Sequence, residues 1–157
     1  MAVRGIVLTG LVAAATAAVL GGTSLATATS GTQRHVFVLK EVQVKSTFIN
    51  LSHTQNGAPG DEFIFRSKML ERDGVRVGWI QAVCTLVFNN QLQCEGTFTL
   101  PGGTLAASAL VGGSNATPVA INGGTGRYAG WTGQETSVGS TTNVNVSTDT
   151  FVLRSPD

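Results

Sequence analysis

The sequence predicts an all-β protein, with about eight short antiparallel strands closing into a single barrel. Val, Ile, Phe and Thr alternate with polar residues in short segments, and clusters of Gly, Asn and Pro separate these segments. Helical periodicity is nearly absent. Such spacing over about 130 residues is typical of a closed barrel or a sandwich, and closure has the advantage of removing unpaired strand edges.

The domain is expected to span residues 29–157, because residues 1–28 have the features of a secretory signal peptide. Arg4 is the positive start, residues 6–20 form an apolar run, and Ala26-Thr27-Ala28 is a small-x-small cleavage pattern. An uncleaved membrane anchor is the alternative. After cleavage we expect a secreted, extracellular protein without a membrane segment.

The charge of the mature chain excludes some partners. Without Arg4, nine of the ten Lys and Arg remain against nine Asp and Glu, so the chain is formally neutral. Nucleic acids and anionic lipids require clustered positive charge, so neither is an expected partner. Abundant Ala, Gly and Thr indicate a GC-rich bacterial genome.

The first three predicted strands follow from alternation and turn residues. In the first, Val42 and Val44 lie on the face opposite Glu41. A polar loop over 50–60 leads to the second, and Asp73-Gly74 is a tight turn into the third. The expected strands are 34–48, 62–70 and 75–88.

Turns divide the rest of the chain in the same way. Pro101-Gly102-Gly103 ends the fourth predicted strand, and Gly112-Gly113-Ser114-Asn115 ends the fifth. The remaining strands are expected over 91–100, 104–111, 117–122, 127–138 and 143–153. The segment 104–109 is unusually small on both faces, which favours a cavity, although neighbouring aromatic side chains could also fill the space.

The two cysteines, Cys84 and Cys94, are expected to form a structural disulfide. An exported chain meets oxidising conditions, and the nine residues between them read as two strand arms around Asn89-Asn90. Two free buried thiols are the alternative.

Three stretches give the chain a family resemblance. They are residues 60–69, Val77-Gly78 with the later Cys84, and residues 120–134, which contain Gly-Gly-Thr-Gly-Arg-Tyr. The last resembles the Gly-Gly-x-Gly-x-Phe/Tyr-x-Gly-x-x-Gly signature shared by allene oxide cyclases and dirigent proteins. The resemblance implies a closed eight-stranded barrel of lipocalin-like, calycin appearance, a homotrimer, and similarity to exported bacterial members of the group.

The glycines of this signature have a structural interpretation. A phosphate-binding loop would need a helix immediately after it, whereas the following residues alternate like a strand. Turns and bulges that require a missing Cβ account better for the run. The residues concerned are Gly123, Gly124, Gly126 and Gly130.

The resemblance also suggests site residues. Glu41 corresponds to the catalytic Glu of allene oxide cyclases, and Gln43 stands where that family has Asn. Ser67 replaces another Asn, and the pocket Tyr corresponds to Val111. A solvent-facing Glu41 is the alternative, because the apolar Val42 and Val44 occupy the other face of its strand.

Two aromatic residues complete the set of candidate ligand contacts. Phe65 lies on the apolar face of its strand, and Trp79 could line an apolar pocket or serve only in packing. Three other strand carboxylates, Glu62, Glu95 and Glu135, are expected to face solvent.

The sequence lacks the residue patterns of a metal site and of a serine hydrolase. His35 and His53 have no acidic residue at metal-ligand spacing, so no metal site is predicted. No serine has a Gly-x-Ser-x-Gly context.

Two function classes remain. The first is a barrel that binds a small apolar or aromatic molecule and steers its cyclisation or stereoselective coupling, as a cofactor-independent isomerase or cyclase. The second is a non-catalytic carrier or structural envelope protein. A binder needs a cavity of roughly 300 Å³ or more with a few convergent polar groups.

Overall fold

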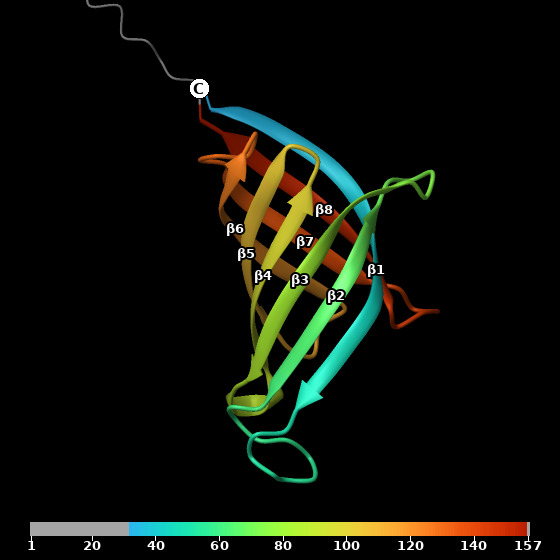
Figure 1. The fold of residues 1–157 in the computed structure, drawn as a ribbon, viewed down its shortest axis with the longest axis vertical. Helices are drawn as coiled ribbons and strands as arrows, with labels where there is room; N and C mark the ends of the chain where they lie inside the picture. The colour runs from blue at the N-terminus through green and yellow to red at the C-terminus, as the bar shows by residue number, and fades with distance from the viewer. Residues whose placement is uncertain (1–31, 157) are drawn as a thin grey trace, which may run out of the picture.

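The computed structural model describes residues 32–156, and these form a closed antiparallel barrel of eight strands, which confirms the predicted fold (Figure 1). Each strand pairs with the next along the chain, and β8 pairs with β1 to close the barrel. The predicted signal peptide lies outside the described residues. The strands are β1 (Gln33–Ile49), β2 (Glu62–Leu70), β3 (Arg76–Leu86), β4 (Leu92–Leu100), β5 (Gly103–Val111), β6 (Ala116–Gly126), β7 (Thr132–Gly139) and β8 (Val146–Ser155).

In the part of the chain that the structure describes, helix is confined to one short turn. The 3-10 segment η1 (Phe88–Asn90) connects β3 to β4 at the end of the barrel that also carries the 50–60 loop (Figure 1). Asn89 and Asn90 both adopt positive φ, 61° and 56°, which Asn tolerates better than most residues. Within residues 32–156, no helix has the length and apolar character needed to cross a membrane.

The glycine-rich run lies differently from its predicted position. We expected β6 to end at residue 122 and the next strand to begin at 127. Instead β6 continues through Gly126, because Gly123 and Gly124 pair with Ala106 and Leu105 of β5 beyond an irregularity in the register. The chain then reverses in a turn in which the Tyr128 amide donates to the Thr125 carbonyl at 3.1 Å.

Gly124 stands where two backbone segments approach each other closely. A Cβ at this position would overlap the carbonyl oxygen of Thr104 and lie 2.7 Å from that of Tyr128. Gly126, at φ 61°, combines a similar approach to Gly102 with a backbone conformation that favours glycine. The end of the barrel is therefore drawn together by main chain that no larger residue would allow.

Gly124→Ala is expected to lower the free energy of unfolding by about 2–3 kcal/mol, because both neighbouring groups are backbone and must shift. The matched control is Gly139→Ala on β7, where an added Cβ meets nothing within 4 Å. That variant should stay within ~0.5 kcal/mol of the parent. Urea unfolding of the two variants measures the difference, and equal stabilities would contradict the close-approach account.

The barrel interior is packed at its centre and toward the β6–β7 turn. Phe98, Phe151, Leu105 and Leu153 are at most 1% exposed, and the ring of Phe98 meets that of Phe151 edge to face, with centroids 5.1 Å apart. Tyr128 folds over this end, with its hydroxyl 3.4 Å from the Pro101 carbonyl oxygen. The cavity inside the barrel lies in the other half, whereas an open hollow of about 650 Å³ lies over the packed end, beside Tyr128 and Trp131.

Strand β1 turns inward the face that carries Glu41. Leu39 is buried on that face, whereas Val36 and Val38 are about half exposed on the other, at 50% and 53%. The valines of β1 therefore face outward while Leu39 and Glu41 face inward, and the solvent-facing alternative for Glu41 does not apply.

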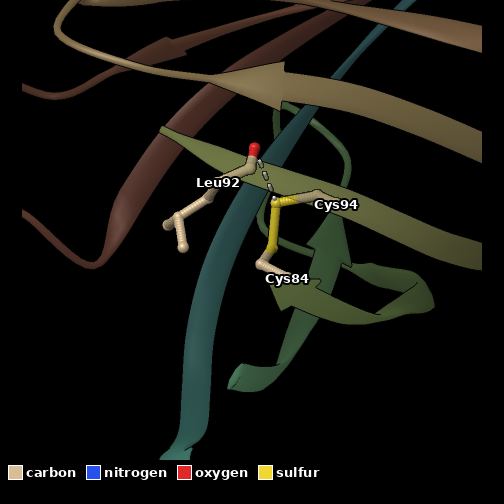
Figure 2. Close-up of a disulfide and its surroundings, with 3 residues drawn as sticks. All are labelled: Cys84, Leu92 and Cys94. Atoms are coloured by element: carbon tan, nitrogen blue, oxygen red, sulfur yellow. Dashed lines mark hydrogen bonds between the residues drawn. A yellow bond between two sulfur atoms is a disulfide. The ribbon is translucent and has the colours of Figure 1, made fainter. Parts of the chain in front are cut away.

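The disulfide between Cys84 and Cys94 is confirmed. The two residues lie opposite each other on β3 and β4 and join the strands next to the β3–β4 turn (Figure 2). The Cys94 sulfur also contacts the Leu92 carbonyl oxygen at 3.9 Å. This contact is van der Waals in nature, because a disulfide sulfur carries no hydrogen to donate.

Asp61 fixes the 50–60 loop at the same end of the barrel. Its carboxylate accepts hydrogen bonds from the backbone amides of Ser52 and Ala58, both at 2.7 Å, and from the Ser52 hydroxyl at 2.8 Å. Its side chain has no exposed surface. Burial alone would raise its pKa, but the hydrogen bonds from Ser52 and Ala58 outweigh that effect and lower the pKa.

Candidate functional site

A cavity of about 250 Å³ occupies the half of the barrel next to the disulfide. Its walls come from seven strands and are mostly apolar, as the small side chains of β5 had suggested. Its volume is slightly below the roughly 300 Å³ at which small-molecule pockets begin, so only a compact molecule fits. The lining residues that define it are Phe63, Phe65, Ile80, Phe98, Ala109 and Val119, with Glu41 and Glu135 among the polar ones.

Three carboxyl groups meet at the inner end of this cavity. Strand pairing places Glu41 of β1 opposite Ser147 and places Asp149 of β8 opposite Leu39, one inward position further along. On the other side of β8, Asp149 lies opposite Ser137, and Glu135 lies opposite Phe151. Glu41, Asp149 and Glu135 therefore lie on adjacent strands, and we call them the acid cluster.

Two serines hold the central carboxylate. Ser137 and Ser147 donate hydrogen bonds to Asp149 Oδ1, at 2.8 and 2.9 Å. The Ser147 hydroxyl also lies 3.4 Å from Glu41 Oε2. Asp149 is fully buried and does not line the cavity, whereas Glu41 and Glu135 do.

The environment raises the pKa of Glu41 to about 7. Burial is the largest cause, followed by the negative charge of Asp149, while the hydroxyls of Ser67 and Ser147 oppose the rise. Burial also raises the pKa of Asp149, although the serine hydrogen bonds oppose it. Two ionised carboxylates cannot hydrogen-bond to each other, so Glu41 and Asp149 become bonded only when one of them carries a proton.

Glu135 is the most strongly perturbed member of the acid cluster. Burial, then the charges of Asp149 and Glu41, raise its pKa to about 9. Its side chain is only 2% exposed, and its Oε1 atom has no hydrogen-bond partner among residues 32–156. At neutral pH Glu135 is therefore a neutral carboxylic acid, and no group among the described residues hydrogen-bonds to its Oε1 atom.

This arrangement provides two kinds of proton chemistry in one apolar space. Glu135 can donate a proton or a hydrogen bond to an oxygen or nitrogen atom of a bound molecule. The pair Glu41 and Asp149 holds a proton that can be gained or lost near neutral pH, as acid–base catalysis requires.

The structure brings some of the sequence-predicted residues to this site and not others. Glu41 and Phe65 line the cavity. Ser67 is fully buried beside Glu41, close enough to influence its pKa, but its hydroxyl makes no well-formed hydrogen bond among the described residues. Gln43 lies opposite Ser67, next to an irregularity in the β1–β2 pairing, and does not line the cavity.

Trp79 does not belong to the cavity. On β3 the inward positions are Ile80, Ala82 and Cys84, so Trp79 lies on the outer face. There the Arg66 guanidinium lies 3.8 Å from the centre of its ring, a cation–π contact. Trp79 therefore packs with surface arginines instead of contacting a ligand.

Sequence reasoning missed two members of the acid cluster. Glu135 was expected to face solvent and is instead buried, because it shares the inward parity of β7. Asp149 was not singled out at all. Its signal was available in β8, where Asp149 alternates in step with Phe151 and Leu153, both fully buried.

A separate hollow, of about 840 Å³, lies on the outer face of β1 to β5. Its side chains include Lys45, Arg66 and Glu95, which water can solvate, and none of the buried unpartnered polar atoms faces it. We therefore place the candidate site inside the barrel. Within residues 32–156, no group of three or more His, Cys, Asp or Glu is arranged to hold a metal ion.

Comparison with known proteins defines the fold class. No protein-family model and no curated protein matches the sequence significantly. Solved structures do match. A pyocyanin demethylase superposes with a TM-score of 0.65 and 24% identity, over 75% of this chain and 99% of that one.

Two other similar structures are named for cyclisation or dirigent chemistry. A Diels–Alderase from Streptomyces koyangensis has a TM-score of 0.60 and 20% identity, over 78% of this chain and 69% of that one. A pterocarpan synthase dirigent protein has a TM-score of 0.62 and 16% identity, over 78% of this chain and 89% of that one. The chain therefore has the barrel fold found in dirigent proteins and in barrel-shaped cyclases.

The raised pKa of Glu135 predicts how stability changes with pH. The ordinary pKa of a glutamate is 4.5, and that of Glu135 in the fold is about 9. Between these two pH values the folded protein holds a proton on Glu135 that the unfolded chain releases. The free energy of unfolding should therefore fall as pH rises through this range, by up to ~1.4 kcal/mol per pH unit for such a group. Glu135→Gln should flatten the slope, measured by urea unfolding from pH 5 to 9.

The control for this measurement is Glu95→Gln, which removes an exposed carboxylate from the outer face of β4. It should leave the slope unchanged. A parent protein that becomes more stable between pH 6 and 9 would show that Glu135 is ionised in the fold.

Proposed function

We propose that the protein binds a small, largely apolar or aromatic molecule in the barrel cavity and steers its cyclisation without a cofactor. The observation that carries this proposal is the acid cluster at the inner end of an otherwise apolar cavity. A barrel that served only as a scaffold would gain nothing from these groups, because each buried acid without a partner costs stability.

In the proposed reaction, the cavity holds the substrate in one conformation while the acids move a proton. Restricting a flexible molecule to a reactive geometry lowers the entropic part of the barrier. Glu135 protonates or hydrogen-bonds the atom where negative charge develops, and the Glu41–Asp149 pair accepts a proton elsewhere on the substrate. The barrel folds of a Diels–Alderase and a dirigent protein support this class of chemistry in general terms.

The position of the cavity can be tested by filling it. Ala109 of β5 lines the cavity, whereas Ala106 of the same strand is exposed on the outer face. Ala109→Phe should weaken binding of the neutral aromatic probe 1-methylnaphthalene by about tenfold or more, because a benzyl group takes the space. Fluorescence titration measures binding, and thermal unfolding verifies that the variant is folded.

Ala106→Phe is the matched control and should bind the probe as the parent does. If both variants bind the probe as tightly as the parent, the cavity is not the binding site. If the parent itself fails to bind any small aromatic molecule, the proposed function is wrong.

We further propose that the protein is exported and assembles as a homotrimer. The disulfide supports export, because such bonds persist in oxidising compartments. The trimer rests on the family resemblance. Native mass spectrometry of protein from the culture medium should show a chain beginning near Thr29, three copies per particle, and a bound small molecule. A monomer or an intact N-terminus would contradict the respective part of the proposal.

A further inference from the structure

Among residues 32–156, the acid cluster has no positively charged partner. No Lys, Arg or His of this part of the chain lines the cavity. None of the effects that shift the pKa values of Glu41, Glu135 and Asp149 comes from a basic residue. Buried acids are normally paired with a cation or satisfied by several donors, so this group lacks its usual counter-charge.

Buried polar atoms without a hydrogen-bond partner indicate where a ligand would bind. Among the described residues, Glu135 Oε1, Asp149 Oδ2 and Ser67 Oγ are buried without a hydrogen-bond partner. Of these residues Glu135 lines the cavity, and buried Asp149 accepts a hydrogen bond from Ser137, which also lines it. The unmet hydrogen-bonding capacity is therefore at the inner end of the cavity, within reach of a ligand.

Hydrogen bonds inside the acid cluster favour a negative charge on it. Burial raises the pKa of Asp149, but Ser137 and Ser147 donate hydrogen bonds to its Oδ1 atom and oppose that rise. One proton shared by Glu41 and Asp149 leaves that pair with one negative charge. The other groups that face the acid cluster, the hydroxyls of β2, β7 and β8, cannot neutralise it.

We propose that the cavity selects a compact aromatic cation, such as a protonated aromatic amine or a cationic nitrogen heteroaromatic, over neutral and anionic molecules of the same shape. This inference rests on the proposed function, because it assigns a charge class to the molecule that the cavity binds. The apolar walls hold the ring, and the acid cluster supplies the missing opposite charge.

Binding of a cation must also displace a proton. A positive charge beside Glu41 and Asp149 favours their ionised forms, so the pKa of Glu41 falls from about 7. Affinity for a cation should therefore rise between pH 6 and 8, with proton release on binding. A neutral ligand has no such coupling, and its affinity should not increase with pH.

The test compares three probes of nearly the same shape on the purified protein. They are the cation N-methylquinolinium, the neutral 1-methylnaphthalene and an anion. At pH 8 we expect the cation to bind at least about tenfold more tightly. Calorimetry in buffers of different ionisation enthalpy should detect proton release with the cation only. The anion 1-naphthoate should bind most weakly of the three.

Two substitutions locate the effect. Glu41→Gln and Asp149→Asn each remove one ionisable group with little change in shape, and each should reduce, several-fold, the ratio of the affinity for the cation to the affinity for the neutral probe. Because two different variants are made, the test can still be read if one of them fails to fold. Glu95→Gln, on the outer face, should keep the full preference.

The outcomes separate this inference from the proposed function. If the parent binds the neutral probe in the cavity but shows no preference for the cation, the inference is overturned and the proposed function stands. If neither probe binds the parent, the inference and the proposed function are both overturned. The same holds if the two probes bind Ala109→Phe as tightly as they bind the parent. A preference that survives both acid substitutions places the cation elsewhere and overturns the inference.

Discussion

The pairing of β1 with β8 is the constraint on which the rest of the molecule depends. β1 is the longest strand, with 17 residues, and it pairs with β2 along one edge and with β8 along the other. This pairing closes the barrel and removes the last free edges of the sheet. It also places Glu41 beside Asp149, which is 108 positions later in the chain. Closure and the proton chemistry of the site thus have the same cause.

The division of the barrel into two halves follows from where large and small side chains fall. Toward the β6–β7 turn, Phe98, Phe151 and Tyr128 fill the interior, and close glycine contacts draw the backbone together. Toward the disulfide, the alanines of β5 leave space. The acid cluster lies at the boundary, where dense packing on one side makes its burial effective and the cavity on the other leaves it accessible to a ligand.

The acid cluster is costly for stability, and that cost is informative. Three acids without a basic partner lower the free energy of unfolding at neutral and alkaline pH, whereas well-packed apolar residues of similar volume would raise it. Such groups are common where a protein holds perturbed pKa values for binding or catalysis. The disulfide near the mouth of the cavity helps to offset the loss, since it restricts the unfolded chain.

The sequence by itself determined the fold class, most strand positions and the disulfide. Alternation and turn residues act within a few positions, so they can be recognised without a structure. The strand ends around the glycine-rich run were misplaced, because pairing with β5 overrode the expected turn. The resemblance pointed to Glu41, which lines the cavity. The aromatic character of Trp79 suggested a ligand contact or packing, and the structure places Trp79 on the outer face.

Only the tertiary structure decided which face of each strand points inward and which acids meet. The outward position of Val36 and Val38 runs against the usual burial of apolar faces, and no local pattern distinguishes Glu135 from the exposed Glu95. Side-chain parity within a strand is visible in the sequence, but its direction is set by pairing between strands far apart in the chain. The cavity and its acid cluster are therefore properties of barrel closure.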